Sequence, residues 1–164
     1  MALFMVQGVS RLYWLPAVAK PTTGPTVAEI TAGIDLSAAV TALEGFAPQS
    51  SKIEVPLLKY KSNAQIEGPQ TFQDATVTLA EDDGKGTSAD ELARQAAEEV
   101  LVEGASGFVY HQRKTSVPAA GSVGYLMGAT VGSQTPSLAM GASAATVAAA
   151  LNPSTPFRKV KVVA

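Results

Sequence analysis

Residues 88–103 carry the clearest secondary-structure signature in this sequence, and it restricts the fold to a mixed class. Ser88 and Glu91 have the spacing of a capping box, in which each side chain satisfies a free N–H of the first helical turn. Gly104 supplies a stop. An apolar stripe recurs with helical period between them, formed by Leu92, Ala93, Ala96, Ala97, Val100 and Leu101. The pattern predicts one helix of several turns over about 88–103, with Arg94, Gln95, Glu98 and Glu99 facing away from the stripe.

The segments on both sides of this helix have the two-residue period of strands. Residues 75–79 are the clearest case, because Ala75, Val77 and Leu79 alternate with polar residues. Residues 27–31 fit a single helical turn closed by Gly33, and 34–43 then read as one strand with Ile34, Leu36, Ala38 and Val40 on one face. Pro16 favours an edge position or an early end for a strand that begins at Arg11.

Further strands are expected at 107–114 and 157–164, with two or three more between 115 and 157. Residues 52–58 alternate like a strand, but Pro56 places them at a sheet edge or in an extended loop, and residues 63–70 read as a loop. Strands before and after one helix favour a mainly β fold, an antiparallel β-sandwich or β-barrel with that helix on one flank. The length of 164 residues suits a single domain, here 11–164, preceded by an N-terminal arm at 1–10.

Composition argues against several functional classes. Apolar residues make up 46% of the chain and charged residues only 16%, so part of the surface is expected to be covered by partners. A net charge of −2 gives no broad attraction to nucleic acid. The apolar start lacks the basic region of a signal peptide, and the long uncharged stretch 115–157 is too rich in Gly, Ser, Thr and Pro for a membrane-spanning helix. A soluble chain made in the cytoplasm is expected.

Few residues offer material for catalysis. His111 is the single histidine and there is no cysteine, so a catalytic triad or a zinc cluster is not expected. Glu81, Asp82 and Asp83 precede Gly84 and are interpreted as a solvated turn rather than as an acid and base pair. We therefore predict no enzymatic activity, no metal site and no cofactor. Tyr13 and Trp14 fit either an interface or the core.

Three stretches together resemble a known family. They are "LYWLPAVAKPTTGPTVAEITAGIDLSAAVTALEGF", "TFQDATVTLAEDD" and "LVEGASGFVYHQRK", followed by a closing basic strand. In this order they are similar to the major tail protein, or tail tube protein, of long-tailed non-contractile bacteriophages, especially those that infect actinobacteria. The likeness spans residues 11–114, and no specific match is seen between 115 and 157.

The resemblance implies a virion protein, assembled in the host cytoplasm, of which six copies form a ring. The rings stack into a hollow tube around a tape-measure protein, and a tail terminator and tail-tip proteins close its ends. The genome passes through the lumen without specific binding, so a neutral or acidic lumen is expected, with Glu44, Glu67 and Asp74 as candidate lining acids.

The family pattern also makes residues 49–69 a long loop that reaches the adjacent ring, with the apolar anchors Ile53, Val55, Leu57, Leu58 and Tyr60. The other interpretation of this segment is an edge hairpin. The apolar arm at 1–10 is expected to dock on a neighbouring subunit. Two other functions stay open at this point: another ring-forming virion protein, such as a tail terminator or connector, and a β-sandwich binding module.

Overall fold

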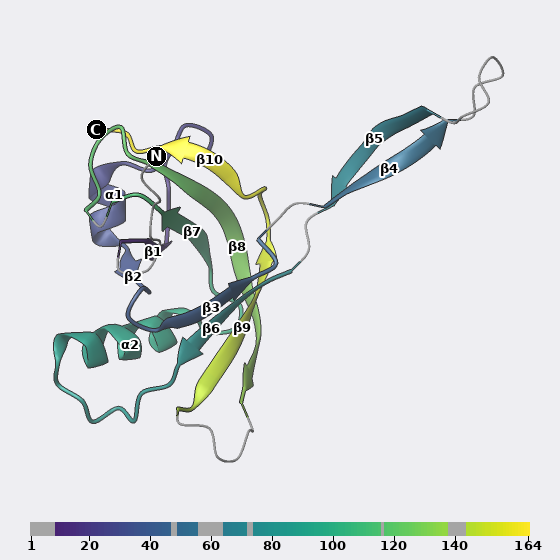
Figure 1. The fold of residues 1–164 in the computed structure, drawn as a ribbon. Coiled ribbons are helices and arrows are strands. Elements are labelled where there is room, and N and C mark those ends of the chain that lie inside the picture. Colours follow the sequence, from purple (N-terminus) through teal and green to yellow (C-terminus); the bar gives the residue numbers. More distant parts are fainter. Residues whose placement is uncertain (1–8, 47–48, 56–63, 72–73, 116, 138–143) are drawn as a thin grey trace, which may run out of the picture.

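The protein is built on one curled antiparallel sheet (Figure 1), seen in a computed structural model that describes residues 9–46, 49–55, 64–71, 74–115, 117–137 and 144–164. The sheet has eight strands, and seven of them lie in the order β2-β1-β7-β8-β9-β6-β3. The eighth, β10, pairs with β8. Their bounds are β1 Arg11–Leu15, β2 Ile34–Asp35, β3 Val40–Glu44, β6 Ala75–Ala80, β7 Ser106–Gln112, β8 Val123–Pro136, β9 Thr146–Pro153 and β10 Arg158–Lys161.

The long strand β8 organises the sheet because it has two successive partners on one side. Its first residues pair with β10, from Val123 opposite Lys161 to Leu126 opposite Arg158. Its later residues pair with β9, beginning at Ala129 opposite Pro153. The other side of β8 pairs with β7. The expected two or three strands between 115 and 157 are therefore two, β8 and β9.

Both faces of the sheet are covered, as in a β-sandwich. Along β1, Leu12 and Trp14 belong to one buried cluster, whereas Tyr13 and Leu15 belong to a second. The first cluster includes Ala97 and Leu101 at the end of one helix, and the second includes Ile30 of the other. A strand buried on both faces reads as continuously apolar, which is the pattern of residues 12–15.

Two glycines make room for the aromatic rings of these clusters. A Cβ atom at Gly107 would lie 2.7 Å from the Trp14 ring, and one at Gly124 would lie 2.5 Å from the Tyr110 ring. A Cβ atom at either position would clash with the ring, so glycine at these two strand positions lets the rings lie flat on the neighbouring backbone.

The helices α1, Val27–Ala32, and α2, Ala89–Val100, both begin with a capping box. The start of α2 after Ser88 is as predicted, and α1 ends at Gly33 as expected. The predicted end of α2 at 103 was wrong, because Leu101 already leaves helical geometry. The stripe is also narrower than predicted: Leu92 is 52% exposed, while Ala97 and Leu101 are buried.

The single strand predicted at 34–43 is two strands separated by a turn. The Asp35 carboxylate accepts the Ser37 N–H at 2.8 Å, and the Leu36 carbonyl accepts the N–H groups of Ala39 and Val40, each at 3.0 Å. This turn breaks the alternation, so Leu36 and Ala39 are buried and Ala38 is exposed. The predicted face of Ile34, Leu36, Ala38 and Val40 was therefore wrong.

Pro16 left two alternatives for the strand that begins at Arg11, an edge position or an early end, and the early end is confirmed. β1 ends at Leu15, immediately before the proline. It is not an edge strand, because β2 and β7 pair with it on its two sides.

Strands β4, Gln49–Val55, and β5, Ala64–Thr71, form a separate two-stranded antiparallel sheet. In Figure 1 this hairpin projects away from the curled sheet. The loop predicted at 49–69 is thus largely two paired strands, and the loop predicted at 63–70 is mostly β5.

In the described part of the chain, no helix is long and apolar enough to cross a membrane.

Candidate assembly surfaces

His111 lies in β7, half-buried, and has a structural partner. Its Nε2 lies 2.6 Å from the Ser10 hydroxyl, and that hydroxyl donates to the Gln112 carbonyl at 3.2 Å. Burial lowers the pKa of His111 below its ordinary value of 6.5, and the charge of Arg113 lowers it further. The neutral ring therefore holds the first described residues against the end of β7.

Among the acids at 81–83, Asp82 anchors the loop before α2, whereas Glu81 and Asp83 are exposed. Asp82 accepts from Arg94 Nε at 3.3 Å, from Gln95 Nε2 at 3.1 Å and from the Gly84 N–H at 3.0 Å. The Gln95 hydrogen bond is the main reason that the pKa of Asp82 lies below its usual value. Arg94 and Gln95, which were predicted to face away from the apolar stripe, contact this loop and belong to neither buried cluster. Within the described ranges, no group of three His, Cys, Asp or Glu residues could hold a metal ion.

Tyr13 and Trp14 are core residues, so of the two interpretations left open, interface or core, the burial favours the core. Trp14 is 2% exposed and Tyr13 is 8% exposed. They point to opposite faces of β1, where each joins a different buried cluster. Adjacent aromatics on a strand anchor both layers when the two faces are covered.

The projecting hairpin carries two of the residues predicted to reach an adjacent ring, Ile53 and Val55. Ile53 lies in the middle of β4, pairs with Ile66 across the hairpin and is 46% exposed. Val55 is the last residue of β4. Leu57, Leu58 and Tyr60 lie outside the described residues. The hairpin therefore presents at least one large apolar side chain to solvent at a distance from the core.

The three candidate lumen acids do not share one place. Glu44 ends β3, and Asp74 immediately precedes β6, the strand that pairs with β3. Both acids are exposed. A Cβ atom added to Gly45 would lie 2.6 Å from the Asp74 carbonyl oxygen, so the two acids lie at one end of this strand pair. Glu67 belongs to the hairpin, where its register partner is Lys52.

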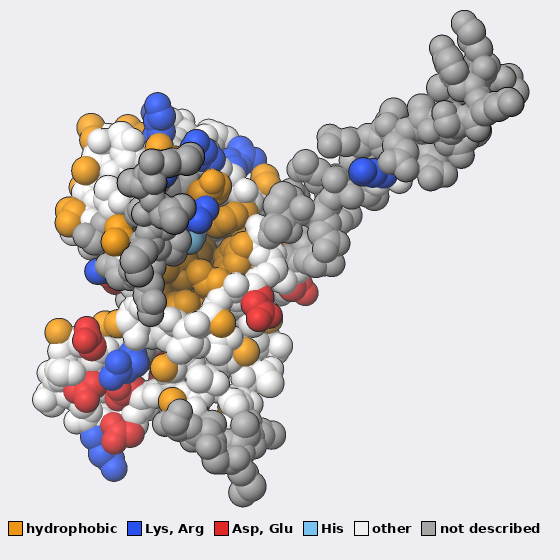
Figure 2. All heavy atoms as spheres, in the orientation of Figure 1, with side chains coloured by type: hydrophobic (Ala, Val, Ile, Leu, Met, Phe, Trp, Pro, Cys, Tyr) orange, Lys and Arg blue, Asp and Glu red, His pale blue; other side chains and the backbone are white. Residues whose placement is uncertain are grey.

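An apolar groove of about 180 Å³ lies beside His111. Figure 2 shows it as a hollow lined by hydrophobic side chains next to the pale blue histidine. The Phe157 ring lies 5.3 Å from the Phe46 ring and 5.2 Å from the Tyr125 ring, measured between centroids. Leu12 and Leu43 complete the lining. Sequence reasoning missed this groove because its residues come from four distant segments.

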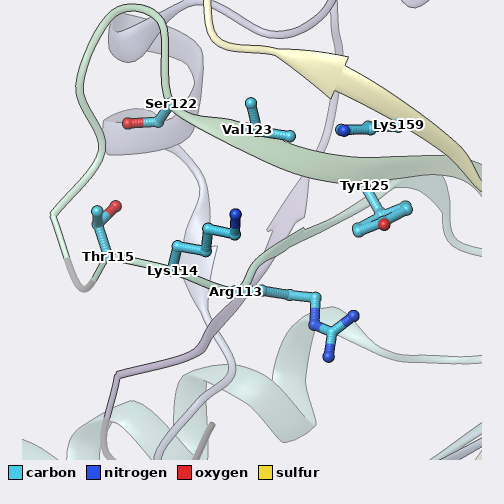
Figure 3. Close-up of a pocket in the computed structure, with 7 residues that line it drawn as sticks. All are labelled: Arg113, Lys114, Thr115, Ser122, Val123, Tyr125 and Lys159. Atoms are coloured by element: carbon cyan, nitrogen blue, oxygen red, sulfur yellow. The ribbon is translucent and has the colours of Figure 1, made fainter. Parts of the chain in front are cut away.

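A second cavity of about 470 Å³ has a basic rim (Figure 3). Arg113 and Lys114 come from the segment after β7, Tyr125 from β8 and Lys159 from β10. Buried Gln112 holds the first of these segments in place, because its Nε2 donates to the carbonyls of Thr115 and Val117, each at 2.9 Å. The three cations are exposed.

Two solved structures are similar to this one over 99% of the chain. A chain of the cryo-EM structure of the anti-feeding prophage baseplate, 6-fold symmetrised, has a TM-score of 0.59 and 10% identity, with 99% of that chain covered. A chain of the anti-feeding prophage cap, described as a tube terminating cap, has a TM-score of 0.55 and 14% identity, with 95% covered. The curled sheet with its helices and hairpin is therefore a fold shared with a chain of each of these two assemblies.

A family model described as phage tail tube protein matches residues 1–164. The chain therefore belongs to the phage tail tube protein family and is a structural tail protein. No sequence among curated proteins matches it significantly. The resemblance noted in the sequence is thereby confirmed at the level of the family.

Proposed function

We propose that the protein is the subunit of a phage tail tube: six copies form a ring, and the rings stack into a hollow tube through which the genome is delivered. The match of the tail tube family to residues 1–164 carries this proposal. The sixfold symmetry of the similar baseplate structure supports the ring of six. The tube would be part of the virion and would assemble in the host cytoplasm, around a tape-measure protein and between a tail terminator and tail-tip proteins.

The surfaces of the subunit suit repeated contact with copies of itself. β3 is an edge strand of the sheet, and its residues from 41 to 44 are exposed. Strands at exposed edges need a partner or a cover, and closing sheets into a ring supplies one. The apolar groove beside Ser10 is an additional surface, which the apolar arm at 1–10 of a neighbouring copy would cover.

The projecting hairpin is proposed as the contact between rings. Its strands pair only with each other, so its length reaches outward instead of enlarging the core. Ile53, whose side chain is exposed, is proposed as one apolar anchor of this contact. The other proposed anchors are Val55, Leu57, Leu58 and Tyr60. The acids Glu44, Asp74 and Glu67 are proposed to face the lumen, where they would repel the DNA backbone and ease its passage. The proposed role is structural, without catalysis.

Negative-stain electron microscopy of the concentrated purified protein tests the proposal. We expect sixfold rings and tubes of uniform bore, because a head-to-tail contact that closes into a ring can also stack without limit. A chain that stays monomeric at high concentration would contradict it. Single rings that never stack would favour the second candidate, a tail terminator, to which the similarity with the tube terminating cap points.

The contact between rings is tested by Ile53→Ser. Loss of an exposed side chain that becomes buried only between rings should leave the melting temperature unchanged and shorten the tubes markedly in micrographs. Lys52→Ser is the matched control, because Lys52 is exposed on the other face of the same strand. Tubes of equal length in both variants would remove Ile53 from the contact.

A further inference from the structure

Charge is divided sharply between two parts of the chain. Residues 81–103, which include α2 and the loop before it, contain eight carboxylates and two basic side chains. Residues 104–164 contain five basic side chains and no carboxylate. The net charge of −2 for the whole chain conceals this division. Figure 2 shows acidic side chains gathered around the lobe that holds α2 and basic ones mostly elsewhere.

The basic part converges on the cavity of Figure 3. Arg113, Lys114 and Lys159 surround it from two segments, and all three are exposed. Among the residues that the structure describes, the one ion pair joins Arg94 to Asp82, so these three cations have no described acid partner. Three like charges around one hollow repel each other and favour an anionic occupant.

Residues 81–103 also contain carboxylates without a described partner in the subunit. Several of their carboxylates make contacts within the subunit. Asp82 and Glu98 hold the loop to α2, and Glu91 caps the helix. The remaining carboxylates that are exposed and make no described side-chain contact are those of Glu81, Asp90, Glu99 and Glu103. This surface presents negative charge to whatever approaches α2.

The two surfaces lie at opposite ends of β8 and cannot meet within one subunit. Val123, at the start of β8, lines the basic cavity. Near the other end, Val131 accepts the Gly104 N–H at 2.8 Å, and Gln134 donates to the Leu101 carbonyl at the end of α2. Complementary charges at opposite ends of one molecule favour a head-to-tail contact between copies.

We infer that the basic cavity of one subunit receives the acidic surface around Glu99 and Glu103 of a second copy of this chain. The contact rests on the proposed self-assembly and adds which surfaces meet. Exposed charge pairs each contribute little to affinity, so the main effect is on orientation and on the rate of association. A subunit approaching the wrong way round would bring like charges together, which keeps the polarity of the assembly uniform. The contact should weaken with added salt.

Charge reversal on each side tests the contact. Lys114→Glu with Lys159→Glu makes the cavity acidic, and Glu99→Lys with Glu103→Lys makes the helix surface basic. At low salt, each double variant should raise the critical concentration for assembly about tenfold, because like charges then face each other. The quadruple variant has complementary surfaces again and should assemble near the wild-type concentration. Pelleting assays and negative stain provide the measurement, and circular dichroism verifies the fold.

The control is Lys20→Glu, which reverses an exposed charge outside both the cavity and residues 81–103 and should assemble like the wild type. Quadruple and double variants that are equally impaired would overturn the contact. So would double variants that assemble like the wild type but fail to retain an oligonucleotide that the wild type binds, because the cavity would then serve a nucleic acid. A wild-type chain that never assembles would overturn the proposed function itself, whereas the other two outcomes leave it standing.

Discussion

Glu29 shows how much one half-buried carboxylate can organise. Its Oε2 accepts the Thr26 N–H at 2.7 Å and its Oε1 accepts the Ala19 N–H at 2.7 Å, so the side chain ties the turn after β1 to the start of α1. These backbone donors, Thr26 first, lower the pKa of Glu29 below its ordinary value of 4.5. α1 in turn places Ile30 in the second buried cluster.

Replacing Glu29 with glutamine should remove this contribution in a pH-dependent way. Because the folded pKa is lowered, the stabilisation is complete above the ordinary pKa of 4.5 and is lost as the pH falls through the folded value. Glu29→Gln should therefore lower the melting temperature by about 2–4 °C at pH 7, and the difference from the wild type should shrink below pH 4.5. Thermal melts across pH measure it.

Glu81→Gln is the control for this measurement, because Glu81 is exposed and makes no described side-chain contact. It should melt like the wild type at every pH. A difference between Glu29→Gln and the wild type that stayed constant down to pH 3 would mean that the titration of Glu29 does not contribute.

The hairpin of β4 and β5 is an element whose removal the rest of the fold should tolerate. Neither strand pairs with the eight-stranded sheet, and the described members of both buried clusters lie outside it. The two ends of the hairpin meet the rest of the fold at nearly one point. A Cβ atom added to Gly45 would lie 2.6 Å from the Asp74 carbonyl oxygen. A short linker can therefore bridge the two ends at little cost in loop entropy.

Replacing residues 49–71 with a short Gly-Ser linker should leave the melting temperature within a few degrees of the wild type. The same variant should fail to form tubes, because the proposed contact between rings is gone, while rings can still close. Calorimetry and negative stain report the two properties separately. Normal tubes from this variant would exclude the hairpin as the contact, and a lost unfolding transition would show that the body depends on it.

At the scale of the whole molecule, the sequence predicted what depends on neighbouring residues. The capping box at Ser88 and the alternation of Ala75, Val77 and Leu79 are local signals, and both are confirmed. The burial of Tyr13 and Trp14 depends on covers from distant segments on both faces of β1, which no local pattern contains. Local sequence patterns therefore predicted the helices and strands better than they predicted which of their residues are buried.

The surfaces were harder to predict than the core. The apolar groove combines Phe46 with Phe157, and the basic cavity combines Lys114 with Lys159. Each pair meets only because β10 returns to the first residues of β8. The sequence contains the cations and the aromatics, but the pairing of β8 with two strands decides which of them become neighbours.

The return of β10 also sets an order for protein synthesis. Val160 and Val162 pack in the cluster that holds Leu15, Ile30 and Tyr110, and Val163 forms a bridge with Thr26 beside α1. A ribosome releases β1 and α1 first and residues 158–163 long afterwards. During translation, the apolar faces of the early elements therefore have no permanent cover, and the nascent chain must avoid aggregation until its last strand leaves the exit tunnel.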